Sequence, residues 1–230
     1  IKDWPEMQPL SDDILLKVVS EIHDPVTTTD ELIPSGETSS FRSNPLGLAE
    51  FTLSRKDPAY VGRAKAVRDR SEEVKAEVSR AEKILEEKYP EFKGRIEKAG
   101  LGSTIYAVKP GDGSAREQAA SCQRVLGASA NIASDYATKR YRSNLINWGM
   151  IPFLYKQGDA AATENLPFAN GDYIFVPGAK KMIAEKLPSV KAYAVRADGT
   201  TAEFDLATGD MTDDERKIIQ AGCLINFYRG

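Results

Sequence analysis

Apolar residues recur through the middle of the chain with two different spacings. The stretches "STIYAVKPG" (103–111) and "GASANIAS" (127–134) are apolar runs bounded by small residues, which is typical of buried strands. Between them, from Ala115 onward, a helical spacing connects Ala119, Cys122, Val125 and Leu126. A strand, a helix and a second strand in this order predict a βαβ unit within a mixed α/β fold.

The longest helical pattern runs from residue 56 to residue 92. Asp57 and Pro58 fit the N-cap and the first position of a helix. The following Tyr89-Pro90 pair predicts its end, because the residue before a proline disfavours helical backbone. One face is apolar and carries Val67, Val74, Val78, Ala81 and Leu85. The other positions mix Glu, Lys and Arg, so we expect a solvated outer face.

Two more helices and an extended segment follow in the second half. Residues 135–149 predict a helix ended by Gly149, and residues 149–155 predict an extended segment. Thr212, followed by Glu215 three residues later, predicts a capping box at the start of a terminal helix.

Short strands alternate with turn residues between those helices. The stretches 171–178, 191–199 and 200–208 are rich in apolar, aromatic and β-branched residues. The Asp198-Gly199 pair between the last two predicts a hairpin.

The N-terminal part is less regular. Residues 12–22, "DDILLKVVSEI", predict either a strand or a short helix, because their periodicity fits both. Residues 24–45 are rich in Thr, Ser, Pro and Gly and predict a long ordered loop, which in a compact domain is usually functional.

Composition and charge narrow the function classes. The 230 residues are 41% hydrophobic and 28% charged, as in an ordinary globular protein, and the net charge of −3 gives no electrostatic argument for nucleic-acid binding. No apolar run could span a bilayer and no signal peptide opens the chain, so we expect a cytoplasmic or equivalent reducing compartment. The first residue is Ile1, which indicates a fragment or a processed piece of a longer protein.

The few cysteines and histidines argue against several site types. Cys122 and Cys223 are a hundred residues apart, show no metal or cluster spacing, and are expected to be free and buried. His23 is the one histidine and falls in a predicted loop, so we expect neither histidine-based catalysis nor a metal site in this chain.

The stretch "GDGSAREQAA" (111–120) is the candidate for chemistry. Glycines let a backbone approach a ligand closely, the start of a helix presents unpaired N–H groups, and an arginine can bind a carboxylate or phosphate through two hydrogen bonds. The same residues also fit a tight turn with a surface arginine, so the residue pattern leaves both interpretations open.

Four blocks together resemble the aconitase superfamily. "TTTDELIPSG" (27–36), "GDGSAREQAA", residues 125–153 and residues 213–229 are similar to family blocks and occur in the family's order. The resemblance covers residues 24–230 and implies the C-terminal swivel domain, with a layered β/β/α fold, while residues 1–23 would be a linker from preceding domains. A separate small subunit, as in isopropylmalate isomerases, is the other arrangement that the family uses.

The resemblance implies a site. Ser114 matches the family's catalytic base, acting as an alkoxide, and Arg116 matches an arginine that binds a substrate carboxylate. Arg42 matches a second carboxylate-binding arginine, and Gly113 and Ala115 complete the substrate-binding set. From the residues alone, Ser114 also fits a helix N-cap, Arg116 a surface ion pair with Glu117, and Arg42 a loop arginine paired to Glu37 or to backbone carbonyls.

This sequence departs from the family pattern at several positions. Ala115 replaces a serine, Gln118 replaces a histidine, and Lys139, Arg140 and Tyr141 stand where the family commonly has arginine, isoleucine and histidine. These changes keep the implied base and carboxylate grip but leave the substrate open.

The function implied is reversible dehydration and hydration of a hydroxy di- or tricarboxylic acid such as citrate or isocitrate. A [4Fe–4S] cluster is expected in the full enzyme, held by its first three domains or by a large subunit, and this chain would bind no cofactor itself and would be inactive alone. The alternative is a non-catalytic or RNA-binding regulatory relative, although nucleic acid is not the expected partner and no membrane partner is expected.

Overall fold

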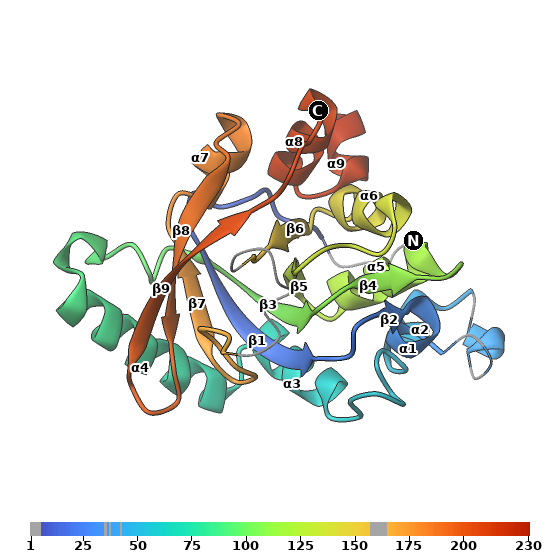
Figure 1. The fold of residues 1–230 in the computed structure, drawn as a ribbon, viewed down its shortest axis with the longest axis horizontal. Coiled ribbons are helices and arrows are strands. Elements are labelled where there is room, and N and C mark those ends of the chain that lie inside the picture. The colour runs from blue at the N-terminus through green and yellow to red at the C-terminus, as the bar shows by residue number, and fades with distance from the viewer. Residues whose placement is uncertain (1–5, 35, 37, 42, 157–164) are drawn as a thin grey trace.

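A computed structural model describes residues 6–34, 36, 38–41, 43–156 and 165–230. Seven strands form one sheet that closes on itself in the order β1-β3-β5-β6-β9-β8-β7 (Figure 1). The strands are β1 (Ile14–Ile22), β3 (Gly100–Ala107), β5 (Ala128–Ala133), β6 (Ile151–Leu154), β7 (Tyr173–Val176), β8 (Ser189–Val195) and β9 (Thr201–Ala207). Strands β1, β3, β5 and β6 run parallel to one another, whereas β7, β8 and β9 pair antiparallel. The mixed α/β class is therefore confirmed.

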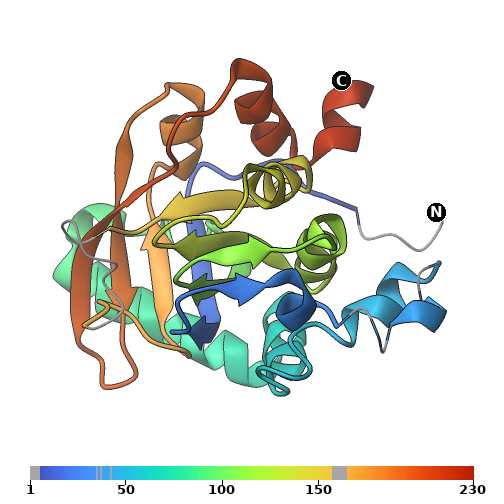
Figure 2. The same cartoon turned by 45° about the vertical axis from the view of Figure 1, so that its right-hand side comes forward.

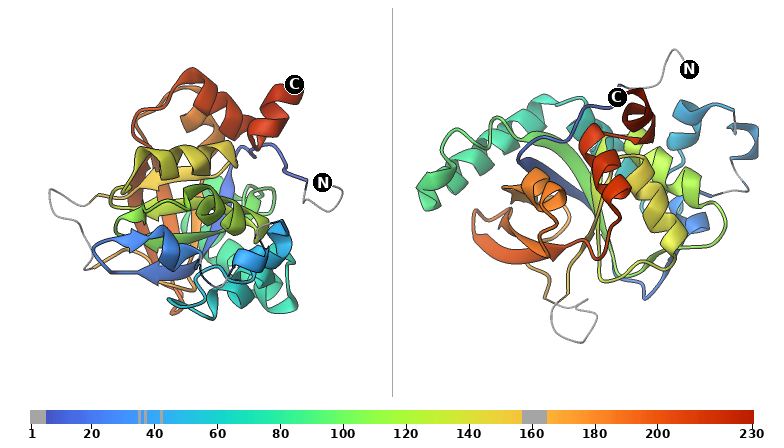
Figure 3. Two further views of the ribbon diagram at one scale, coloured as in Figure 1. Left: turned by 90° about the vertical axis from the view of Figure 1, so that its right-hand side faces the viewer. Right: turned by 90° about the horizontal axis from the view of Figure 1, so that it is seen from above.

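Helices cover the outside of this closed sheet. In Figure 2 the pair α5 and α6 lies beside the parallel strands, and Figure 3 shows α4 on the opposite side of the sheet from this pair. The helices are α1 (Thr29–Leu32), α2 (Pro45–Ala49), α3 (Tyr60–Arg68), α4 (Glu72–Lys88), α5 (Arg116–Val125), α6 (Lys139–Asn147), α7 (Ala179–Ala184), α8 (Asp213–Ala221) and α9 (Leu224–Arg229), with short 3₁₀ turns at Ser39–Phe41 and Pro90–Phe92.

The predicted βαβ unit is confirmed. Strand β3, helix α5 and strand β5 follow one another, and β5, α6 and β6 repeat the arrangement. The four residues predicted to face the core from this helix, including Leu126 just after α5, are buried. One core cluster joins α5 and α6 to β3 and β5, a second joins β1 and the antiparallel strands to α8, and a third seats α4 on β7.

Residues 14–22 form a strand inside the sheet. Strand β1 pairs parallel with β3 and antiparallel with β7, and seven of its nine residues are buried. Burial on both faces gives a nearly continuous apolar run, which is why periodicity did not separate strand from helix. The prediction that residues 1–23 form a linker is therefore wrong for residues 14–22, because this strand belongs to the same closed sheet as the later strands.

The long helical pattern is two helices. Helix α3 ends at Arg68, Arg70 has a positive φ of 50°, and Ser71 begins α4 by accepting a hydrogen bond from Val74 N (3.2 Å). Asp57 does not cap the helix; it accepts a hydrogen bond from Ser20 Oγ (2.6 Å) and pairs with Arg63. The end before Pro90 and the burial of most of the apolar face are confirmed.

The C-terminal predictions hold with two changes. The three strands, the β8–β9 hairpin and the capping box between Thr212 and Glu215 are confirmed. Helix α7 lies between β7 and β8 and is too short, at six residues, to show a helical period. The terminal helix is interrupted at Gly222, whose φ is 100°, and continues as α9.

Candidate functional site

The candidate site lies where two distant segments pair. Strand β2 (Thr27–Thr28) pairs in parallel with β4 (Pro110–Asp112), and Thr27 N donates to Lys109 O (3.0 Å). This small sheet, separate from the closed one, sets the threonine-rich loop against the start of "GDGSAR" (Figure 1). Both segments follow parallel strands, β1 and β3, so they meet at the carboxyl edge of the sheet, where ligands of α/β proteins usually bind.

Two glycines allow this loop to pack closely on both sides. Gly111 has a φ of 103°, and a Cβ there would lie 2.4 Å from the ring of Tyr141. Gly113 has a φ of 132°, and a Cβ there would lie 2.3 Å from Thr29 Oγ1. A side chain at either position would meet both backbone strain and a steric clash. The glycines therefore bring α6 and the threonine-rich loop up to the backbone just before Ser114.

Ser114 is exposed at the end of this loop. Within the described part of the chain its hydroxyl makes no hydrogen bond, and the N-cap of α5 is Ala115, which supplies no side-chain cap. The N-cap interpretation of Ser114 is therefore wrong. Because the first N–H groups of a helix lack intrahelical partners, Ser114 stands beside a set of amides that favour negative charge.

Arg116 is the first residue of α5 and is partly buried. Its Nε is buried without a hydrogen-bond partner, and it forms no ion pair with any described residue, Glu117 included. The surface ion pair with Glu117 is therefore not formed. A guanidinium that is partly desolvated and has no ion-pair partner can donate hydrogen bonds to an anionic ligand.

Arg42 lies outside the described residues, so its predicted role in binding a carboxylate stays a prediction. The helix that follows it, α2, begins at Pro45 and packs against α5. Gln118, Lys139 and Arg140 are exposed near the starts of α5 and α6.

Tyr141 is fully buried, behind the loop. Burial raises the pKa of its hydroxyl well above the ordinary value, so the group is neutral and can donate a hydrogen bond. Its partners are Gln123 and Asn131, two polar residues that sequence reasoning did not single out. The available signal was their polarity at positions inside an apolar helix face and a buried strand.

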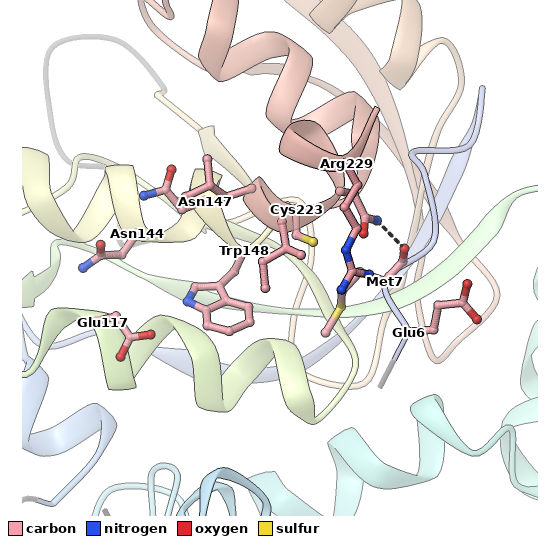
Figure 4. A pocket seen from close by; sticks show the side chains of 11 residues that line it. Glu6, Met7, Glu117, Asn144, Asn147, Trp148, Cys223 and Arg229 are labelled. Atoms are coloured by element: carbon pink, nitrogen blue, oxygen red, sulfur yellow. Dashed lines mark hydrogen bonds between the residues drawn. The ribbon is translucent and has the colours of Figure 1, made fainter. Parts of the chain in front are cut away.

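A cavity of about 570 Å³ lies elsewhere, between α6, α9 and the N-terminal segment (Figure 4). Trp148, Leu224 and Ile225 give it apolar walls, and Asn226 Nδ2 donates to Met7 O (2.7 Å) at its edge. Among the described residues, Glu117 is its one lining residue on α5, and none of the described site residues lines it.

The cysteines are free and buried, as predicted. Burial raises the pKa of the Cys122 thiol to about 12, so this group is not a nucleophile at neutral pH. Among the residues that the structure describes, no cluster of three or more His, Cys, Asp or Glu could hold a metal ion. Nor does any described helix have the length and apolar character needed to cross a membrane.

Residues 63–158, which contain the loop, α5 and α6, match the family described as the aconitase C-terminal domain. Aconitate hydratase A of Rickettsia bellii is 29% identical over 129 residues, which cover 56% of this chain and 14% of the relative. Aconitate hydratase A of Mycobacterium avium is 31% identical over 119 residues, which cover 51% of this chain and 12% of the relative. The matched part therefore spans only about an eighth of the length of these relatives.

The fold is similar to that of a solved protein. The crystal structure of 3-isopropylmalate dehydratase from Methanocaldococcus jannaschii superposes with a TM-score of 0.53 at 19% identity, over 94% of this chain and 93% of that one. The match extends across nearly all of both chains, so the expected swivel-domain fold is confirmed.

Proposed function

We propose that this chain is the swivel domain of an aconitase-like hydro-lyase, which adds and removes water on a hydroxy di- or tricarboxylic acid. The observation that carries the proposal is that two residues without hydrogen-bond partners among the described residues lie two positions apart: Ser114, which is exposed, and Arg116, whose Nε is buried. Both lie at the start of α5, within the segment that is similar to the aconitase C-terminal domain.

Arg116 would hold one carboxylate of the substrate. A guanidinium presents parallel N–H donors that match the two oxygens of a carboxylate, which fixes orientation as well as distance. Since no described acid forms an ion pair with this guanidinium, a bound carboxylate would supply the anionic partner that the chain itself does not provide. Gly113 and Ala115 flank Ser114 and carry no large side chain, so they would let the substrate approach the backbone on either side of Ser114.

Ser114 would take the proton from the carbon next to a carboxylate. A serine hydroxyl is a weak acid, so the alkoxide form needs positive surroundings. The amides at the start of α5 and the Arg116 guanidinium provide them. The alkoxide would become the serine hydroxyl, and the electron pair of the broken C–H bond would form the double bond between the two carbons. The hydroxyl on the neighbouring carbon would leave as hydroxide, and a proton from solvent would convert it to water.

A [4Fe–4S] cluster bound elsewhere in the full protein would act as the Lewis acid on the departing hydroxyl. We propose that other domains of the same protein, or a large subunit, hold this cluster. On this proposal the isolated chain has half of a site and no turnover.

Substitution of Ser114 in the intact, anaerobically cluster-reconstituted protein tests the proposal. We expect turnover on one acid from a panel of citrate, isocitrate, 2-methylcitrate, homocitrate and isopropylmalate, and its loss in Ser114→Ala with substrate binding retained. Ser143→Ala, which removes an exposed serine on α6, is the matched control and should keep wild-type turnover. Retained activity in Ser114→Ala would remove Ser114 from the mechanism. A protein with an intact cluster that turns over none of these acids would contradict the proposed reaction.

A further inference from the structure

Three fully buried polar side chains lie behind the candidate site loop: Gln123 on α5, Asn131 on β5 and Tyr141 on α6. The Tyr141 hydroxyl donates to Asn131 Oδ1 (2.6 Å), and Asn131 Nδ2 donates to Gln123 Oε1 (2.8 Å). Gln123 Nε2 donates to the Tyr141 oxygen (3.0 Å), which closes the circle. We call these three residues the polar ring; it joins two helices to the strand that connects them in the chain.

Two backbone carbonyls fix the direction of the polar ring. Gln123 Nε2 also donates to Ala119 O (2.8 Å), and Asn131 Nδ2 also donates to Ala130 O (3.1 Å). Turning either amide over would set its oxygen against a carbonyl oxygen, so each amide has one permitted orientation. Every N–H and O–H of the three side chains then has an acceptor, and a fully satisfied buried network is rigid.

The polar ring reaches the site loop through Tyr141. The Tyr141 ring fills the space that a side chain at Gly111 would need, at 2.4 Å from the position of such a Cβ. One residue of the same helix start adds a second contact: Thr138 Oγ1 donates to Gly111 O (3.0 Å) and accepts from Tyr141 N (3.1 Å). The backbone three residues before Ser114 is thus held by the first turn of α6.

We propose that the polar ring sets the position of the loop that carries Ser114, and that Tyr141 is a positioning residue for the hydration reaction; the second part rests on the proposed function. Strand β2 holds the loop from one side and Tyr141 holds it from the other. The direction of the Ser114 hydroxyl relative to Arg116 and to the start of α5 then depends on a tyrosine that touches no substrate.

Tyr141→Phe tests this role because it removes one oxygen and keeps the aromatic ring against Gly111. It leaves Asn131 Oδ1 without a donor and one N–H of Gln123 without an acceptor, so the polar ring opens. In the intact protein we expect kcat to fall by about 10- to 100-fold with little change in KM, as for a small misplacement of a reacting group. We also expect the pH–rate profile to move to higher pH, because Ser114 would lie less favourably against the charges that stabilise its alkoxide.

Tyr136→Phe is the matched control. Tyr136 is also buried, and its hydroxyl donates to Phe153 O (2.9 Å) and more weakly to the backbone oxygen of Asn131 (3.4 Å), but to no side chain of the polar ring. Both substitutions remove one buried, hydrogen-bonded hydroxyl, so a purely structural role predicts equal effects. We expect Tyr136→Phe to keep the wild-type kcat and pH–rate profile when both variants are assayed well below their unfolding temperatures. Equal effects in the two variants, or no effect of Tyr141→Phe, would overturn the positioning role.

Hydrogen exchange on the 230-residue chain separates the two proposals. If the intact wild-type protein turns over no acid, the proposed function fails, but the polar ring is still tested by backbone exchange in residues 108–115. Faster exchange of this segment in Tyr141→Phe and not in Tyr136→Phe supports the positioning of the loop. Unchanged exchange in Tyr141→Phe overturns it.

Discussion

The two ends of α5 carry arginines in opposite situations. At the C-terminal end, Arg124 donates from Nη1 to Ala128 O (3.0 Å), from Nη2 to Gly222 O (3.2 Å), and from Nε to Met7 Sδ (3.1 Å). At the N-terminal end, Arg116 has a buried Nε with no partner among the described residues. The Arg124 guanidinium therefore donates from all three of its nitrogens within the fold, whereas the Arg116 guanidinium donates to no described residue.

The helix dipole sharpens this contrast. A positive charge is favourable at the C-terminal end of a helix and unfavourable at the N-terminal end. Arg124 therefore sits at the stabilising end, although burial lowers the pKa of its guanidinium to about 10. Arg116 sits at the destabilising end, and no described acid forms an ion pair with it. An arginine that costs stability and makes neither an ion pair nor a side-chain hydrogen bond with any described residue is best explained by a ligand, which is why the proposed site is at this end of α5.

Arginine-to-methionine substitutions at the two ends give the largest expected difference. Arg124→Met removes the guanidinium donors from the carbonyls of Ala128 and Gly222 and leaves an apolar chain in their place, and we expect the free energy of unfolding to fall by about 3 kcal/mol. Arg116→Met removes an unpaired donor and an unfavourable charge, and we expect it to change stability by less than about 0.5 kcal/mol or to raise it. Denaturant-induced unfolding of the chain measures both. A large loss of stability in Arg116→Met would show that this arginine serves the fold.

Gly113→Ala tests how closely the loop before α5 is packed. The new methyl group would meet Thr29 Oγ1 at a backbone φ of 132°, and we expect a loss of about 2 kcal/mol from strain and overlap. Gly171→Ala is the matched control, because Gly171 also has a positive φ, 97°, but open space around its missing Cβ. Thermal unfolding of both variants separates the overlap from the backbone strain. Equal losses would mean that the contact with Thr29 contributes nothing.

Much of this site could be predicted from the sequence because its signals are local. The glycines, Ser114 and the start of α5 follow one another within six residues, and the βαβ unit follows from apolar runs and helical spacing. The pairing of residues 27–28 with residues 110–112 could not be derived from spacing, since it joins segments about 80 residues apart. The sequence analysis did not predict it.

The contacts of the polar ring and the break between α3 and α4 could not be predicted from the sequence. Gln123 and Asn131 are each placed by neighbours on other elements, and a single polar residue in an apolar pattern does not reveal its partners. The break at Asp69–Ser71 interrupts a charged segment in which helix formers continue on both sides. The break coincides with the positive φ of Arg70, a backbone conformation that an arginine in the sequence does not signal.

Arg116→Lys has a smaller expected effect and acts on binding alone. A lysine keeps the charge but cannot present two parallel donors, so in the intact protein we expect the KM for the acid to rise about tenfold, which corresponds to about 1.4 kcal/mol. Arg140→Lys on α6 is the control, because Arg140 is exposed and makes no ion pair with any described residue. Steady-state kinetics on the active acid measures the difference. An unchanged KM in Arg116→Lys would separate Arg116 from the substrate and leave its lack of partners unexplained.

The smallest expected effect concerns the caps of two helices. Helix α8 begins with a complete capping box, in which Thr212 Oγ1 accepts from Glu215 N (3.1 Å) and Thr212 N donates to Glu215 Oε1 (2.9 Å). Helix α5 begins at Arg116, and its N-cap residue Ala115 supplies no side-chain cap. We expect Thr212→Ala to cost about 1 kcal/mol and Ala115→Ser to add about 0.5 kcal/mol or less, both measured by thermal unfolding. If Ala115→Ser stabilises the chain but raises KM in the intact protein, the uncapped amides of α5 are kept open for the substrate; if it lowers KM, the hydroxyl itself contacts the substrate, and the absence of a cap at α5 has no role in binding.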